Sequence, residues 1–362
     1  MVPTRVAHPF WMHDEMQATP AALDRALGDT DAQAQRQAVA TRLAGAHRVV
    51  LTGCGTAYHA ALVGASFLVE LGSGRIDARA VQAFELAHYT PAPLGLDDVL
   101  IVLSHSDKPS ASNAALARAK ANGAFCVTVT GDAKSPAAQG ADAVIDTGYP
   151  EVKSFTYTIS YSLMLAVLAE LAADAAGQDA ELAQVRQIPV WHRAALALEP
   201  RVEALARRLA DRNRWIFAGA GGNWATALEA SLKMQETNYS AAFGMEMEEV
   251  LHGPVAALGD SVLVTIAPPG AGRDRALDLL RTARILGGET VALGAEGDAE
   301  LESAVDAFVP LPAACPESLS PAPYHVPLHL LSYWVAVTKG TNPDLMRRED
   351  PRYLEARRSY TL

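Results

Sequence analysis

The sequence predicts an α/β protein made of two similar domains, each with a doubly wound, mostly parallel sheet. Short β-rich runs alternate with apolar helical segments, which is the pattern of strands joined by helical crossovers. The stretch VVLTGCGTAYHAAL from Val49 also aligns with WIFAGAGGNWATAL from Trp215, an offset of 166 residues. A repeat this long with the same element order indicates a duplicated domain, and 362 residues are enough for two separate cores.

The first domain is expected over residues 31–175, after an N-terminal helical arm at residues 1–30. The arm is expected to be helical from His8 to about Leu27, with Thr19 and Pro20 as an N-cap and first-turn pair. Strands are predicted at 48–52, 76–81, 99–104, 125–130 and 143–146, and helices at 32–46, 56–71, 110–122 and 154–173.

The second domain is expected over residues 200–341, after a linker at 176–199 whose main signal is Ile188-Pro189. A helix is predicted at 223–238 with Asn223 as its N-cap, and another at 324–339, where Gly340 ends it. Residues 342–362 carry much charge without apolar periodicity, which indicates a tail.

Composition excludes several classes of protein. Half of the residues are apolar and the net charge is −11, so a phosphate backbone is not an expected partner. Three scattered cysteines, Cys54, Cys126 and Cys315, indicate a reducing cytoplasm. No signal peptide is expected, and the longest apolar run, 159–173, is shorter than the ~20 residues of a membrane span.

One predicted helix concentrates charge among apolar residues. Glu229, Lys233 and Glu236 fall at i, i+4 and i+7, so they share one face, and His252 follows sixteen residues after Glu236. Such a face is either functional or a solvated surface with weak ion pairs. A carboxylate can move a proton between neighbouring sugar carbons and an imidazole can open a sugar ring, so the pair fits aldose-ketose chemistry.

Several motifs together resemble the tandem sugar-isomerase (SIS) domain family, including the isomerase half of glucosamine-6-phosphate synthase. They are ALEASLKMQE, EVLHGP, GCGTAYHAAL, VKSFT and PLHLLSYWVAVTKGTNPD. The resemblance implies that Glu236 is the general base and acid and that Lys233 and Glu229 support it. It also implies that His252 opens the ring in a neighbouring subunit's site, hence a homodimer, and that the tail covers the sugar. No cysteine follows Met1, so we expect no glutamine hydrolysis.

The resemblance also implies a loop site for the sugar phosphate. Its expected residues are Gly53, Cys54, Gly55, Thr56, Ser104, His105, Ser106 and Lys108. This chain has Ala57, Asp107 and Pro109 where the family has a serine, a glycine and a threonine. Because two hydroxyls are lost and a carboxylate is gained, the sequence leaves open whether the substrate is phosphorylated.

Two further basic residues are candidates for substrate binding. Lys153 matches a family lysine near the sugar, although a surface lysine at a helix start fits equally. Arg358 stands where relatives that isomerise fructose 6-phosphate carry a Schiff-base lysine. A guanidinium stays protonated and cannot be an amine nucleophile, so covalent ring opening is not expected. Arg358 therefore pairs with an anion or lies in solvent.

Three reactions share the expected intermediate: deamination of glucosamine 6-phosphate, cleavage of a fructosamine 6-phosphate, and plain isomerisation. A regulatory module that only binds a sugar phosphate is the alternative from another class. No cofactor is expected, because both glycine loops lack the third glycine of a dinucleotide fingerprint. His325 and His329 are spaced for a metal, but Pro327 lies between them and no third ligand is evident.

Overall fold

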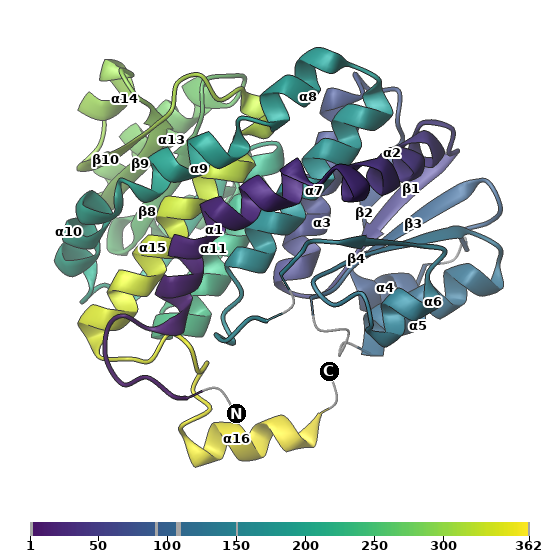
Figure 1. The fold of residues 1–362 in the computed structure, drawn as a ribbon. Helices are drawn as coiled ribbons and strands as arrows, with labels where there is room; N and C mark the ends of the chain where they lie inside the picture. Colours follow the sequence, from purple (N-terminus) through teal and green to yellow (C-terminus); the bar gives the residue numbers. More distant parts are fainter. Residues whose placement is uncertain (1–2, 91–92, 106–109, 150, 361–362) are drawn as a thin grey trace. The chain divides into compact units, whose positions relative to one another are not determined.

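The computed structural model describes all residues except 1–2, 91–92, 106–109, 150 and 361–362 (Figure 1). In the first half, five parallel strands form one sheet with the order β2-β1-β3-β4-β5. The strands are β1 (Arg48–Thr52), β2 (Ala78–Ala80), β3 (Asp98–Leu103), β4 (Phe125–Thr130) and β5 (Ala143–Asp146). Each lies within about two residues of its predicted range, because β-branched runs between turns are local signals.

The second half contains a second sheet of five parallel strands with the order β10-β9-β8-β6-β7. Its strands are β6 (Arg214–Gly219), β7 (Ala241–Glu246), β8 (Val262–Ala267), β9 (Glu289–Ala295) and β10 (Ala307–Leu311). Matching β6 with β1 and β8 with β3 gives the same order in both sheets. The predicted duplication of a parallel α/β domain is therefore confirmed.

Helices of the first half join and cover the first sheet. They are α2 (Thr30–Ala44), α3 (Thr56–Leu71), α4 (Ala83–His88), α5 (Ser110–Ala121), α6 (Pro136–Gly140), α7 (Ile159–Ala176) and α8 (Asp179–Val185). α3 and α7 pack on each other, and α2 packs on α7. By length and apolar composition α7 could cross a membrane, but 83% of it is buried, as expected of a core helix.

The second half has its own set of helices. They are α9 (Ile188–Leu196), α10 (Glu199–Leu209), α11 (Gly222–Asn238), α12 (Met247–Leu251), η1 (Pro254–Asp260), α13 (Arg273–Ile285), α14 (Ala299–Ser303), η2 (Glu317–Leu319) and α15 (Pro321–Lys339), followed by α16 (Pro351–Ala356) and η3 (Arg357–Ser359) in the tail. The segment predicted as a linker contains α8 and α9, and α9 buries Trp191 and His192.

The N-terminal arm forms helix α1 (Trp11–Gly28), which runs straight through Pro20. The helical arm predicted from His8 to about Leu27 is confirmed, but the N-cap predicted at Thr19 is wrong. The carboxylate of Asp344 accepts hydrogen bonds from the backbone N–H groups of Trp11 and Met12, at 2.9 and 2.8 Å. This capping from a residue far along the chain starts the helix earlier than the Thr19-Pro20 pair indicates.

Alternating side chains of β6 build two cores, one on each face of the second sheet. Trp215 and Phe217 join a cluster that also contains Phe10 and Met12 of the N-terminal arm. Ile216 and Ala218 join a cluster with residues of α13 on the other face. The period of two in a buried parallel strand explains why β6 reads as continuously apolar.

By contacts, the chain divides into two compact units that interleave along the sequence. One comprises residues 1–17, 153–156 and 190–347, and the other comprises 18–152, 157–189 and 348–362. The second sheet and the charged helix α11 lie in the former. The first sheet and its glycine loop lie in the latter.

Candidate functional site

The loop after β1 forms a sharp turn that only glycine can make at two positions. A Cβ atom on Gly53 would lie 2.8 Å from the backbone carbon of Ala57, so any side chain there would collide with the start of α3. Gly55, the N-cap of α3, has φ 56° and ψ −129°, and no side chain caps the helix. The backbone N–H of Ala57 donates to the carbonyl of Cys54 at 3.2 Å, so the turn itself satisfies part of the first turn of α3.

Hydroxyl groups from two neighbouring strands lie at the carboxyl edge of the first sheet. β1 and β3 are adjacent, and Thr56 and Ser104 follow their last residues closely. Both side chains are buried. In open α/β sheets this edge, at the switch point between β1 and β3, is where ligands bind. The predicted residues Ser106 and Lys108, and the departures Asp107 and Pro109, lie outside the described residues.

Two other predicted loop residues have environments that oppose charge. Burial lowers the pKa of His105 to about 4, so its ring is neutral at pH 7, and it packs against Gly131, where a Cβ would lie 2.8 Å from the ring. Burial also raises the pKa of the Cys54 thiol, whose Sγ lies 3.8 Å from Ser112 Oγ. Cys54 is therefore a packed thiol and not an activated nucleophile.

The charged face of α11 is buried, which excludes the solvated alternative for two of its three residues. The side chains of Glu229 and Lys233 have no exposed surface, and that of Glu236 is 13% exposed. Lys233 Nζ lies 3.1 Å from Glu229 Oε1 and 2.6 Å from Glu236 Oε2. Glu236 is thus the only member of this trio whose side chain has exposed surface.

Electrostatics keep the central ammonium charged. Burial lowers the pKa of Lys233, but the adjacent carboxylates of Glu229 and Glu236 outweigh that effect, and the net shift is upward. A buried charge is tolerated only when it is paired in this way, and removing one partner leaves an uncompensated charge. The arrangement therefore fixes Lys233 as a cation between two carboxylates.

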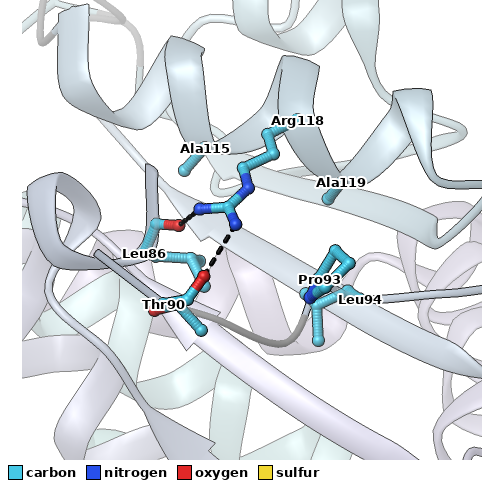
Figure 2. A pocket seen from close by; sticks show the side chains of 7 residues that line it. All are labelled: Leu86, Thr90, Pro93, Leu94, Ala115, Arg118 and Ala119. Atoms are coloured by element: carbon cyan, nitrogen blue, oxygen red, sulfur yellow. Dashed lines mark hydrogen bonds between the residues drawn. The ribbon is translucent and has the colours of Figure 1, made fainter. Parts of the chain in front are cut away.

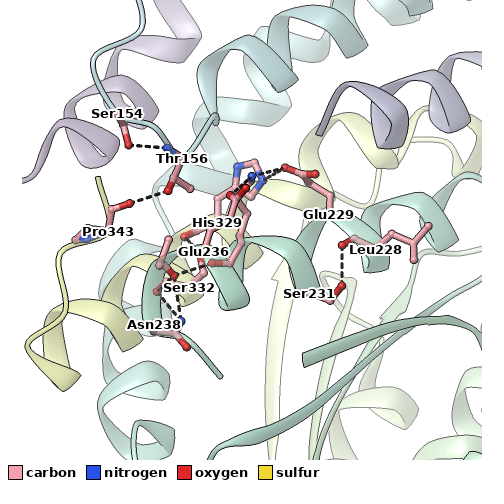
Figure 3. Close-up of polar contacts among 12 residues, drawn as sticks. Ser154, Thr156, Leu228, Glu229, Ser231, Glu236, Asn238, His329, Ser332 and Pro343 are labelled. Atoms are coloured by element: carbon pink, nitrogen blue, oxygen red, sulfur yellow. Dashed lines mark hydrogen bonds and ion pairs between the residues drawn. The ribbon is translucent and has the colours of Figure 1, made fainter. Parts of the chain in front are cut away.

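The frame around this trio comes from hydrogen bonds between α11 and α15 (Figure 3). Thr237 Oγ1 donates to the carbonyl of Lys233 at 2.7 Å, and it lies 3.1 Å from the carbonyl of Ser332. Asn238 Nδ2 donates to the same Ser332 carbonyl at 3.2 Å. Asn223, predicted as the N-cap, instead sits in the first turn after Gly221 and donates to Ser320 Oγ at 2.7 Å.

Sequence reasoning missed one member of the site. His329 of α15 places Nε2 3.7 Å from Glu229 Oε1, and both side chains are buried (Figure 3). The spacing of His325 and His329 was a visible signal, but it was considered only as a metal pair, which Pro327 and the lack of a third ligand argued against. Only the packing of α15 on α11 shows that His329 faces a carboxylate. No group of three or more metal-binding side chains occurs among the described residues.

His252 does not belong to the buried cluster. It is the C-cap of α12, its side chain is 67% exposed, and its Nε2 lies 3.0 Å from Glu248 Oε1. Arg275 also pairs with Glu248, at 2.5 and 2.7 Å. The imidazole is thus presented at the surface of its unit by an acidic partner on the same helix.

The two remaining basic candidates have local partners. Lys153 Nζ lies 4.4 Å from the centre of the Trp11 ring, and its backbone N–H donates to Glu15. Arg358 pairs with Glu355 at 2.9 Å, and its side chain is 71% exposed. The position of Arg358 agrees with the solvated alternative, whereas Lys153 packs on the N-terminal arm.

Two cavities lie in the unit that holds the first sheet, and no predicted site residue lines either. Arg118 fills the first, where its guanidinium donates to the carbonyls of Leu86, Ala87 and Thr90 and leaves only about 10 Å³ (Figure 2). This is a structural contact that satisfies the end of α4. The second, of about 760 Å³, lies between α2 and the edge of β4 and β5.

Comparison with known proteins identifies the family. The SIS domain matches twice, at residues 42–173 and 208–339. The glutamine–fructose-6-phosphate aminotransferase (isomerizing) of Pyrococcus horikoshii is 32% identical over 347 residues, which cover 94% of this chain and 57% of that protein. The chain thus spans a little over half the length of this curated relative.

Solved structures show the same fold. Tagatose-6-phosphate ketose/aldose isomerase from Escherichia coli superposes with a TM-score of 0.82 at 21% identity, covering 95% of this chain and 97% of that one. Glucosamine-6-phosphate deaminase from Thermotoga maritima gives 0.75 at 18% identity, covering 92% and 97%. The predicted resemblance is confirmed: the chain belongs to the SIS domain family and carries two copies of the domain in tandem.

Proposed function

We propose that the protein is an enzyme of the aldose-ketose isomerase class that acts at C1 and C2 of an amino sugar phosphate, as a deaminase of the glucosamine-6-phosphate type. One observation carries the proposal: Lys233 is a buried ammonium held between Glu229 and Glu236, and of the three side chains only that of Glu236 has exposed surface. Burying three charges costs free energy, so their presence favours a chemical role over a structural one.

In this reaction Glu236 takes the proton from C2 of the open-chain amino sugar and returns it to C1. Removal of that proton, with uptake of a solvent proton by O1, gives an enaminol. Protonation at C1 and loss of a proton from nitrogen then give an imine at C2. Water then hydrolyses the imine to the ketose phosphate and ammonia. Lys233 offsets the charge that develops on the intermediate, and Glu229 holds Lys233 in place.

The loop after β1 and the end of β3 would bind the phosphate. Thr56 and Ser104 would supply hydroxyls, and the N-terminal end of α3 would supply the positive end of its dipole. Ser106 and Lys108 would complete this site. The 6-phosphate is part of the proposal because relatives named for phosphorylated sugars share the family and the fold.

His252 would open the sugar ring in the site of a second copy of the chain. Its 67% exposed side chain and its pairing with the surface residue Glu248 support a role outside its own unit. A homodimer with shared sites is therefore part of the proposal. Arg358 cannot form a Schiff base, which favours loss of an amine over isomerisation of fructose 6-phosphate. Cleavage of a fructosamine 6-phosphate would use the same carboxylate.

The test is a substrate panel. Amino sugars and fructosamines, each with and without a 6-phosphate, are assayed for released amine and for ketose or aldose product, with wild-type protein and Glu236→Gln. We expect turnover of a phosphorylated member that the substitution abolishes. Binding without turnover across the panel would instead support a regulatory module. Full turnover by the Glu236→Gln protein would remove Glu236 from the mechanism.

A further inference from the structure

Three buried imidazoles continue the charged trio into the interior of the same unit. His329 and His325 of α15 have ring centres 4.9 Å apart, and His192 of α9 lies 5.8 Å from His325. At the near end, His329 Nε2 lies 3.7 Å from Glu229 Oε1. The row therefore ends on the carboxylate that holds Lys233.

Burial keeps these rings uncharged. It lowers the pKa of His192 to about 3 and that of His325 far below the usual value, and it lowers that of His329 despite the attraction of Glu229. The charged groups that act on them are Glu229 and Lys233 from α11 and Arg193 from α9. At neutral pH the three imidazole rings are therefore uncharged, and they act only as hydrogen-bond donors and acceptors.

The backbone defines one tautomer. His325 Nδ1 lies 2.9 Å from the carbonyl of Pro321, and a carbonyl can only accept, so Nδ1 carries the proton of this neutral ring. The same logic applies to His329, because a carboxylate also only accepts. A favourable contact with Glu229 requires the proton on Nε2. The distance of 3.7 Å is longer than a hydrogen bond, and such contacts often tighten when substrate binds.

We propose that His329 is a positioning residue that presents a neutral N–H to Glu229 and so keeps the Lys233 ammonium shared between Glu229 and Glu236. The proposal rests on the function proposed above. A neutral donor matters here. A cation at residue 329 would neutralise Glu229 and repel Lys233 toward Glu236, where it would weaken the base. Without a donor, Glu229 would draw Lys233 away from Glu236.

Kinetics test this role with a matched control. His329→Leu and His329→Phe both remove the donor, and His329→Phe keeps a planar ring. We expect each to lower kcat about tenfold with KM within about twofold, and to move the acid limb of the pH profile to higher pH, because Glu236 loses part of its cation. His329→Gln retains an N–H and should recover most of the loss. His192→Leu, equally buried but two rings from Glu229, should leave the profile unchanged.

A second measurement does not depend on turnover. Unfolding of wild type, His329→Phe, Glu229→Gln and the double variant forms a thermodynamic cycle. We expect the double variant to lose less stability than the two single losses together. Additive losses, or an unshifted pH profile, or a His192→Leu effect as large as that of His329→Phe would overturn the proposal. Turnover that survives Glu236→Gln would instead overturn the proposed function, and the cycle would still report on His329.

Discussion

The glycine loops of the two halves have nearly the same backbone, yet the helices that follow them carry different side chains. Gly55 has φ 56° and ψ −129°, and Gly221 has φ 54° and ψ −135°. In each loop the preceding glycine is approached closely by the backbone of the next helix: a Cβ on Gly219 would lie 2.2 Å from the carbonyl oxygen of Asn223. Duplication has thus kept the turn while the helices diverged.

The helices α3 and α11 differ most in the residues of their buried faces. The positions 166 residues before Glu229 and Lys233 hold Val63 and Phe67, both fully buried in α3. Where the first half buries apolar side chains, the second half therefore buries an ion pair at a cost in stability. The buried charges of α11 are therefore not explained by stability alone. Substitutions that give α11 the apolar residues of α3 can test this.

The largest expected effect is at Glu236, whose side chain is partly exposed. Glu236→Gln keeps the shape and removes the base, so we expect kcat to fall about 10²–10⁴-fold with substrate binding retained. The matched control is Glu70→Gln in α3, at the equivalent position, where Glu70 is exposed and accepts from Ser66. Steady-state kinetics and a binding isotherm compare the two. Equal effects at both positions would contradict the distinction between the helices.

The second-largest effect is expected at the buried Lys233 ammonium. Lys233→Phe copies the first half at one position and removes the cation that pairs with Glu229, so we expect a loss of about 3–5 kcal/mol in the free energy of unfolding. Adding Glu229→Val copies the first half at both positions and removes the buried carboxylate as well. The double variant should recover most of the stability but no activity. Denaturant unfolding measures both; a double variant less stable than Lys233→Phe would indicate that the trio is structural.

How much of this could be predicted depends on the range of the interactions involved. The range predicted for α3 is exact, and the strands were located, because their signals are local: β-branched runs, glycine turns and apolar periodicity. The N-cap of α1 was wrongly predicted at Thr19 because Asp344 caps this helix from the other end of the chain. Local sequence contains no trace of such a contact.

The candidate site could likewise be predicted only where its signals are local. The i, i+4, i+7 spacing placed Glu229, Lys233 and Glu236 on one face, and the structure adds that this face is buried. The partnership of Glu229 with His329 depends on how two helices separated by about a hundred residues pack, so the sequence showed only two histidines on one helix. Burial and long-range pairing are properties of the fold, and they decide whether a charged face is a site.

The surface imidazole offers a smaller but qualitative test. If His252 acts in a partner's site, mixing inactive Glu236→Gln and inactive His252→Ala chains gives heterodimers with one site carrying both defects and one carrying none. We expect recovery of about a quarter of wild-type activity after subunits exchange. Size-exclusion chromatography confirms mixed dimers. A mixture that stays inactive despite forming them would place both residues in the same chain's site, or His252 in none.

The row of buried histidines in the second half should also influence the response of stability to acid. His192, His325 and His329 stay neutral in the folded state, whereas unfolding lets them protonate near pH 6.5. Their folded pKa values are depressed, so the stability that they contribute is complete above pH 6.5 and is lost as pH falls below it. Each proton that the folded state excludes adds about 1.4 kcal/mol per pH unit to the slope of the unfolding free energy against pH.

Buried carboxyls whose pKa values are raised oppose this trend, and Glu15 is one of them. Burial raises the pKa of Glu15 from 4.5 to about 7, so its stabilisation is complete below pH 4.5 and is lost as pH rises through 7. We expect melting temperature to fall from pH 6.5 to 4.5, less steeply in His192→Leu and more steeply in Glu15→Gln. Melting curves at several pH values measure this. An unchanged slope in His192→Leu would show that the buried ring does not control it.

The smallest effect is expected in the tail, which has no counterpart in the first half. Arg358→Ala removes a guanidinium that is 71% exposed and pairs with Glu355 three residues away. Exposed pairs at this spacing contribute only a few tenths of a kcal/mol, so we expect stability within about 0.5 kcal/mol of wild type.

The KM for a phosphorylated substrate is a more sensitive measurement of the role of Arg358. If the tail closes over the sugar during turnover, Arg358 would leave Glu355 for the phosphate, and KM would rise in Arg358→Ala but not in the control Arg352→Ala. Arg352 pairs with Asp350 at 2.8 Å, and its side chain is even more exposed than that of Arg358. An equal change of KM in both variants would therefore assign the effect to net charge.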